Sequence, residues 1–291
     1  MAPPLLRAIL CAALLFIGAS VMAQTPERLT VQTPYGAREV LVLRGGAGPR
    51  PTLLVLHGAQ GTGEGAARTT GFAEAAARRG FNAVFPSGIG KRWHYGPAVR
   101  GPDPDDFTFL RTLAAQLVSQ GIAAPGKLYI AGISNGGMMT FALVCRYRDM
   151  FAGVATVISS VPSGLSQCAL PSVPYVLING TADPVMPFAG GAIARGGAGE
   201  VIGAERTLAL MTRANGCSGN PVSQRLPSRG GPTSVIRMTW PGCRPGTSVT
   251  FYRVEGGGHT VPGTAPPRMQ ALGATNEDLN AADAVMDVFA H

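Results

Sequence analysis

Residues 129–138 contain a serine whose neighbours suit it to act as a nucleophile. The segment reads Tyr-Ile-Ala-Gly-Ile-Ser-Asn-Gly-Gly-Met, which places Ser134 between Gly132 and Gly136 in the pattern G-x-S-x-G. A buried apolar run precedes it and a helical pattern follows, and the two glycines permit the sharp turn that lifts a hydroxyl out of a sheet. We therefore predict that Ser134 forms a covalent acyl intermediate. The alternative is a glycine-rich turn whose serine only caps a helix.

A serine hydroxyl is a poor nucleophile until a base removes its proton, and histidine is the usual base. The chain has four histidines, of which His291 is the last residue. His259 follows a strand pattern at 249–254 and stands on a flexible glycine-rich loop, from which it would reach over the edge of a sheet. We predict His259 as the base; an exposed histidine on a flexible turn is the alternative.

The base needs an acidic partner that fixes its tautomer. Asp183 follows the buried run 176–178, at the carboxyl end of a strand, where open α/β sheets place their sites. The other acidic residues between Ser134 and His259 lie in helical regions or only four residues before the histidine. The chain order Ser134, Asp183, His259 is the order expected of a strand–turn–helix serine site, whereas an Asp-Pro turn without a catalytic role is the alternative.

An acyl-transfer site also needs N–H groups that stabilise the negative charge developing on the carbonyl oxygen. One donor is expected to be the backbone N–H of Asn135. The second should come from the loop after Leu56-His57-Gly58, at Ala59 or Gln60. No metal or organic cofactor is required by this chemistry, and no Cys-x-x-Cys or paired histidines indicate a metal site.

The elements that would position these residues alternate along the chain. A hairpin pattern opens it, and short apolar runs then alternate with helical patterns, ending in a helix that starts near Asn276. Strands are expected at 28–33, 38–44, 53–56, 81–85, 128–131, 154–158, 175–178 and 249–252, and helices at 71–79, 108–120, 136–147 and 204–214. This alternation predicts a three-layer α/β fold, a mostly parallel sheet with helices on both faces.

The first residues indicate export. Of the 291 residues, 1–23 combine Arg7, a short apolar run and an Ala-containing end, which is typical of a secretory signal peptide. We expect cleavage to leave 24–291 as a single catalytic domain, secreted to the periplasm or the exterior. The apolar run is too short for a membrane span, and no second run approaches that length. The sequence does not indicate the oligomeric state.

The chain is basic, with 24 Lys and Arg against 16 Asp and Glu and a net charge of +8. Its positive residues are scattered and never form a run of five or six, which argues against a nucleic-acid partner.

Four cysteines remain after export, an even number in an oxidising compartment. They are Cys145, Cys168, Cys217 and Cys243. Three pairings are possible, and the spacing favours Cys145 with Cys168 and Cys217 with Cys243.

Several strings together carry a resemblance to a known family. They are Leu56-His57-Gly58, Gly132-Ile133-Ser134-Asn135-Gly136-Gly137-Met138-Met139, Asn179-Gly180-Thr181-Ala182-Asp183 and Gly257-Gly258-His259-Thr260. The chain resembles the secreted polyhydroxybutyrate depolymerase and feruloyl esterase group of α/β-hydrolases over nearly all of residues 50–265. The resemblance implies Ser134 as nucleophile, Asp183 as acid and His259 as base, and the two disulfides favoured above.

Two positions depart from that group and bear on the substrate site. Val261 stands where members often have tryptophan after the His-Thr pair, which predicts a smaller or more open wall on the acyl side. The usual Trp-Asn is Trp93-His94 here, which would place His94 at the mouth of the site. We expect His57, Trp93, His94 and Val261 to contact the substrate.

These observations predict a secreted serine esterase that hydrolyses carboxylic esters through an acyl-enzyme. The expected partner is a small or oligomeric ester, either a hydroxyalkanoate oligomer or a feruloyl or acetyl ester of plant polysaccharide. An acyltransferase on the same fold is one alternative, because the acyl-enzyme is common to both reactions. A secreted binding protein without turnover is the other.

Overall fold

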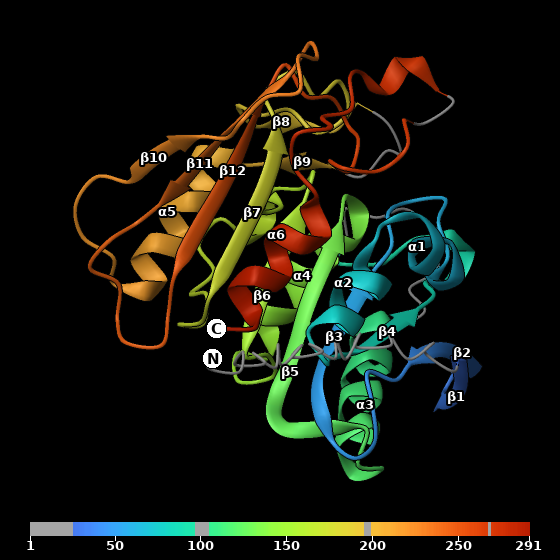
Figure 1. The fold of residues 1–291 in the computed structure, drawn as a ribbon. Coiled ribbons are helices and arrows are strands. Elements are labelled where there is room, and N and C mark those ends of the chain that lie inside the picture. Colours follow the sequence, from blue (N-terminus) through green and yellow to red (C-terminus); the bar gives the residue numbers. More distant parts are fainter. Residues whose placement is uncertain (1–25, 97–104, 195–198, 267–268) are drawn as a thin grey trace, which may run out of the picture.

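The computed structural model describes residues 26–96, 105–194, 199–266 and 269–291. The expected signal peptide 1–23, with Cys11, lies outside them. The described residues form one ten-stranded sheet in the order β1-β2-β4-β3-β5-β6-β7-β12-β11-β10 (Figure 1). Its strands are β1 (Pro26–Thr33), β2 (Gly36–Leu43), β3 (Arg50–Leu56), β4 (Asn82–Pro86), β5 (Ala123–Ile133), β6 (Gly153–Val157), β7 (Tyr175–Gly180), β10 (Val222–Arg225), β11 (Ser234–Thr239) and β12 (Val249–Glu255).

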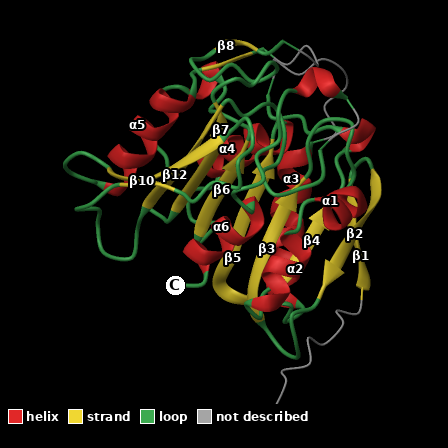
Figure 2. Ribbon diagram, turned by 45° about the horizontal axis from the view of Figure 1, so that its top comes forward, coloured by secondary structure: helices red, strands yellow, loops and turns green. Residues whose placement is uncertain are grey.

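The centre of the sheet is parallel and its two ends are antiparallel. Strands β4, β3, β5, β6, β7 and β12 run parallel to one another, whereas β1 and β2 at one edge and β11 and β10 at the other are added by antiparallel pairing. Loops gather at the end of the sheet to which the parallel strands point (Figure 2). This is the end where Ser134, Asp183 and His259 leave their strands.

Helices cover both faces, as predicted. The described residues form six α-helices, which are α1 (Gly63–Thr69), α2 (Phe72–Arg78), α3 (Asp106–Ser119), α4 (Asn135–Arg146), α5 (Ala204–Asn215) and α6 (Ala281–Phe289). Helices α1, α2 and α6 pack on one face and α3, α4 and α5 on the other (Figure 1). Residues of one strand alternate between the two cores: Leu54 and Leu56 face one, while Leu53 and Val55 face the other. Burial on both faces explains why the central strands are continuous apolar runs.

The structure differs from the sequence prediction at four of these elements. Helix α1 and strands β10 and β11 were not expected, because a seven-residue helix and a polar edge strand have weak periodic signals. The last helix begins at Ala281 instead of near Asn276. The carbonyl oxygen of Asn276 accepts the N–H of Gly263 and its side chain contacts Thr233, so this residue anchors a loop, whereas the side chain of Asn280 accepts the N–H of Asp283 and caps α6.

Two disulfides tie loops to the helices on the α4–α5 face. Cys145 bonds Cys168, and Cys217 bonds Cys243, which is the pairing that the spacing favours. The loops that they close have sequence separations of 23 and 26 residues. Each is expected to stabilise the fold by about 3 kcal/mol by restricting the unfolded chain. In the described residues, no helix is both long enough and apolar enough to cross a membrane.

Candidate active site

Ser134 lies on a strained turn between β5 and α4. Its φ of 51° and ψ of −115° are unusual for a residue with a side chain. Glycine is required on both sides because α4 approaches the sheet closely: a Cβ at Gly132 would collide with the carbonyl of Gly136, and a Cβ at Gly136 would collide with the carbonyl of Leu56. The turn therefore presents the Ser134 hydroxyl at the carboxyl end of β5, next to the first N–H groups of α4.

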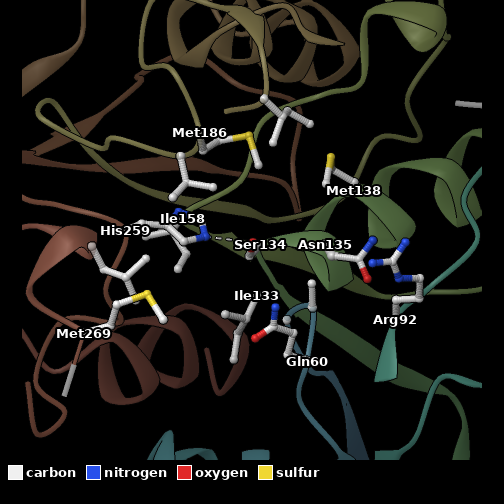
Figure 3. A pocket seen from close by; sticks show the side chains of 15 residues that line it. Gln60, Arg92, Ile133, Ser134, Asn135, Met138, Ile158, Met186, His259 and Met269 are labelled. Carbon is white, nitrogen blue, oxygen red and sulfur yellow. Dashed lines mark hydrogen bonds between the residues drawn. The ribbon is translucent and has the colours of Figure 1, made fainter. Parts of the chain in front are cut away.

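A continuous chain of hydrogen bonds joins the three predicted catalytic side chains. Ser134 Oγ lies 2.9 Å from His259 Nε2, and His259 Nδ1 lies 2.8 Å from Asp183 Oδ2. Figure 3 shows His259 directed toward Ser134 across the pocket. The Asp183 carboxylate is 2% exposed and the His259 ring 11% exposed. A carboxylate on Nδ1 keeps that nitrogen protonated, which leaves Nε2 free to accept the serine proton.

The backbone fixes the Asp183 carboxylate. Its second oxygen, Oδ1, accepts the N–H groups of Val185 and Met186, each at 2.8 Å. Both oxygens are therefore engaged, one by the turn after β7 and the other by His259. The carboxylate cannot rotate away from the histidine without losing two hydrogen bonds.

The loop that carries His259 is held more firmly than its glycines suggest. The N–H of His259 donates to the carbonyl of Leu272 at 2.6 Å, and that of Gly258 donates to Ala274 at 2.8 Å. Gly180 needs to be a glycine because Gly257 and Gly258 pass directly against it. The expectation of a flexible loop is thus wrong: the glycines serve close packing, and the imidazole has a fixed position.

The hydrogen bonds of the backbone N–H groups distinguish the two candidates for the second donor to the oxyanion. The N–H of Gln60 donates to the carbonyl of Lys91 at 2.7 Å and is already occupied. In the part of the chain that the structure describes, no acceptor takes the N–H of Ala59. Asn135 is the first residue of α4, where backbone N–H groups have no partner within the helix. The structure thus favours Ala59 over Gln60, whose side chain lines the pocket instead (Figure 3).

His57 is a buried structural residue, contrary to the expectation that it contacts the substrate. Its Nε2 accepts the N–H of Gly88 at 2.9 Å, and its Nδ1 lies 2.7 Å from the carbonyl of Gly58. These partners fix the tautomer with the proton on Nδ1. Burial lowers the pKa of His57, so that the ring is neutral at neutral pH.

Trp93, His94 and Val261 are likewise absent from the pocket wall. Trp93 is fully buried, and its Nε1 donates to the carbonyl of His57 at 3.0 Å. Its backbone N–H donates to Asn135 Oδ1 at 2.7 Å, and Asn135 Nδ2 donates back to its carbonyl at 3.1 Å. The Asn135 side chain therefore holds the loop after β4 against the turn at Ser134. Val261 packs against the core on the α1–α2–α6 face.

A buried ion pair that the sequence did not reveal supports this loop. Arg38 Nη1 lies 2.7 Å from Asp106 Oδ1, and the two side chains are 6% and 0% exposed. Asp106 Oδ2 accepts the backbone N–H of His94 at 2.9 Å, and Arg38 Nη2 donates to the carbonyl of Ser87 at 2.7 Å. The guanidinium also lies over the ring of Phe109, 3.5 Å from its centroid. The pair thus joins β2, the loop 87–94 and the start of α3.

We expect Arg38→Met to destabilise the protein by about 3–5 kcal/mol, because it leaves the Asp106 carboxylate charged and buried. The double variant Arg38→Met/Asp106→Leu should lose less free energy of unfolding than Arg38→Met or Asp106→Leu alone, since no unpaired charge remains buried. Urea unfolding of the three variants measures the free energies. Arg44→Met, which breaks the more exposed pair with Glu27, is the control and should cost about 1 kcal/mol or less. A loss of free energy of unfolding in the double variant equal to the sum of the two single losses would contradict this expectation.

The pocket above Ser134 has a volume of about 280 Å³. Its wall is mainly apolar. It is formed by Met138 of α4 and by residues between the main elements that the sequence prediction did not assign to the site: Ile158, Val185, Met186, Ile193, Met269 and Leu272. Arg92 and Gln60 are its polar side chains besides Ser134, Asn135 and His259. No group of three or more His, Cys, Asp or Glu side chains in the described residues could hold a metal ion.

The sheet and the turn at its centre define the α/β-hydrolase fold. A solved acetyl xylan esterase from Aspergillus awamori has this fold, with a TM-score of 0.59 at 14% identity over 84% of this chain and 96% of that one. The prolyl oligopeptidase family model matches residues 86–164, from β4 through α4 into the loop after β6.

Two curated relatives are esterases. The putative esterase NocK of Nocardia uniformis subsp. tsuyamanensis is 34% identical over 82% of this chain and 73% of its own length. Feruloyl esterase B of Piromyces equi is 27% identical over 72% of this chain, which spans 39% of that protein. The chain belongs to the esterase family that includes NocK and is a carboxylic ester hydrolase.

Proposed function

We propose that this protein is a secreted serine esterase in which Ser134, His259 and Asp183 form the catalytic triad. The observation that carries the proposal is the unbroken chain of hydrogen bonds from Ser134 Oγ through His259 to Asp183, at 2.9 and 2.8 Å. The roles follow from chemistry: a hydroxyl with a neutral imidazole as acceptor is activated for attack, and a buried carboxylate stabilises the imidazolium that forms.

In the acylation half-reaction, Ser134 Oγ attacks the ester carbonyl carbon while His259 Nε2 takes the hydroxyl proton. The carbonyl oxygen becomes an oxyanion, which the N–H groups of Asn135 and Ala59 stabilise. Collapse of this intermediate breaks the carbon–oxygen bond of the ester, and His259 gives its proton to the departing alcohol. The acyl group remains on Ser134.

Deacylation repeats these steps with water as nucleophile. His259 Nε2 takes a proton from the water as its oxygen attacks the acyl carbon, and the same two amides hold the second oxyanion. Collapse releases the carboxylic acid and returns the proton to Ser134.

The lining of the pocket supports the proposed substrate class, and the disulfides support the proposed location. The largely apolar pocket suits an acyl or alkoxy group of short length, which fits hydroxyalkanoate oligomers as well as feruloyl or acetyl esters of plant polysaccharide. Two disulfides fit an oxidising compartment, the periplasm or the exterior. We further propose that residues 24–291 form one catalytic domain, since the ten-stranded sheet takes its strands from Pro26 through to Glu255.

A fluorophosphonate probe tests the proposed nucleophile, because it phosphonylates only an activated serine. We expect one probe per chain, with peptide mapping placing it on Ser134 and loss of ester hydrolysis in proportion to labelling. A panel of short p-nitrophenyl esters, methyl ferulate, acetylated xylan and 3-hydroxybutyrate oligomers then ranks the substrates. Hydrolysis without labelling, or labelling elsewhere, would overturn the assignment of Ser134.

A further inference from the structure

Arg92 places a permanent positive charge in the wall of the pocket. It lines the pocket with Ser134 and is half-buried, and it lies on the Asn135 side of the serine, opposite His259 (Figure 3). It forms no ion pair with any carboxylate in the described ranges. Arg38, by contrast, is neutralised by Asp106. The pocket therefore holds a guanidinium whose counter-charge the described chain does not supply.

The backbone on both sides of Arg92 is fixed to the catalytic loops. The carbonyl of Lys91 accepts the N–H of Gln60, and Trp93 exchanges two hydrogen bonds with the Asn135 side chain. A Cβ at Gly88 would collide with the carbonyl of Arg92, so this turn is closed tightly. The oxyanion loop and the start of α4 thus hold the backbone of Arg92 in place. The guanidinium can move over the pocket only by rotation of its own side chain.

A guanidinium beside an apolar wall loses part of its hydration and is best compensated by a carboxylate, whose two oxygens match its planar fork. We propose that Arg92 binds a carboxylate of the substrate, so that the preferred ester carries a free carboxylate in the same molecule. This inference rests on the proposed function of the same site. Arg92 is then a specificity-determining residue.

This assignment separates the two substrate classes that the pocket accommodates. A soluble hydroxyalkanoate oligomer ends in a carboxylate, whereas acetyl and feruloyl esters of neutral sugars carry none. The carboxylate can be attached to the alcohol side of the ester, as in such an oligomer, or to the acyl side, as in a monoester of a dicarboxylic acid. The chemistry at Arg92 is the same in both, and two substrate pairs distinguish them.

The test uses substrates that differ only in charge. The first pair is the 3-hydroxybutyrate dimer and its terminal primary amide; the second is monomethyl glutarate and its primary amide. We expect the wild type to prefer the acid in at least one pair, and Arg92→Gln to lower the acid-to-amide ratio of kcat/KM in that pair by about tenfold to 100-fold. The pair that responds identifies the side of the ester that carries the carboxylate.

Two variants and one condition complete the test. Arg92→Lys keeps the charge without the planar fork and should retain part of the ratio. Arg206→Gln removes an exposed arginine on α5 and should retain the wild-type ratio. The preference should also weaken as the salt concentration rises. A wild type without preference in either pair, or an unchanged ratio in Arg92→Gln, would overturn the role of Arg92. Failure of the proposed triad is recognised separately, since neither acid nor amide would then depend on Ser134.

Discussion

Replacing Ser134 with alanine should lower kcat for every hydrolysed ester by about 10⁵-fold to 10⁶-fold. The reason is that the acyl-enzyme cannot form, although the oxyanion amides and the pocket remain. His259 and Asp183 then have no nucleophile to activate, so that their presence adds little to the residual rate. The measurement is kcat under saturating substrate, with the same variant tested for loss of fluorophosphonate labelling.

The fold of this variant should be intact, because alanine at position 134 keeps the strained backbone and loses only an oxygen. The free energy of unfolding in urea therefore serves as its control and should stay within about 1 kcal/mol of the wild type. Ser228→Ala, on an exposed loop, is the matched serine substitution and should retain wild-type kcat. Equal rates in Ser134→Ala and wild type would contradict the serine mechanism and would favour a different nucleophile.

The turn at Ser134 was predictable because its constraints are local. Two glycines, a preceding apolar run and a following helix fix the turn within ten residues, and the structure adds that the neighbouring carbonyls of Leu56 and Gly136 exclude any side chain at the glycines. The grouping of Ser134, Asp183 and His259 was also predictable, because each of these residues follows a strand. Parallel strands bring their carboxyl ends to one edge wherever they lie in the sequence.

The pocket wall was not predictable, because it depends on loops without periodicity. Met186 and Ile193 come from the segment after β7, and Leu272 comes from a short turn for which the sequence predicts no element. Their place in the pocket is set by tertiary contacts such as the bond from His259 N–H to Leu272. The spacing of residues along the chain does not predict such tertiary contacts.

The misplaced substrate residues have a related cause. A polar or aromatic residue next to a catalytic motif suggests a substrate contact, but exposure is decided by distant partners. His94 is buried because its backbone N–H donates to Asp106, and Asp106 is stable there because Arg38, on strand β2, neutralises it. No local pattern joins positions 38, 94 and 106. Arg92, two residues before His94 on the same loop, has no predicted role in the sequence analysis, and it is the residue of this loop that lines the pocket.

Asp183→Asn should lower kcat by about 10⁴-fold while leaving the geometry of the site nearly unchanged. The two N–H groups of Val185 and Met186 hold the side-chain oxygen at the position of Oδ1, so that the asparagine NH₂ is directed toward His259 Nδ1. A donor at this place favours the tautomer that is protonated on Nε2. That nitrogen can then no longer accept the proton of Ser134, which lies 2.9 Å away.

The tautomer explanation can be distinguished from a loss of stability. Because the asparagine keeps the hydrogen bonds to the turn after β7, urea unfolding should show a small change compared with the loss of kcat. The rate of fluorophosphonate labelling should fall with kcat, since both depend on the activated serine. Asp149→Asn, on an exposed loop after α4, makes the same change of charge and should retain wild-type kcat. Wild-type activity in Asp183→Asn would show that the carboxylate does not orient His259, and the tautomer would then have to be set by the fixed His259 backbone and the surrounding pocket.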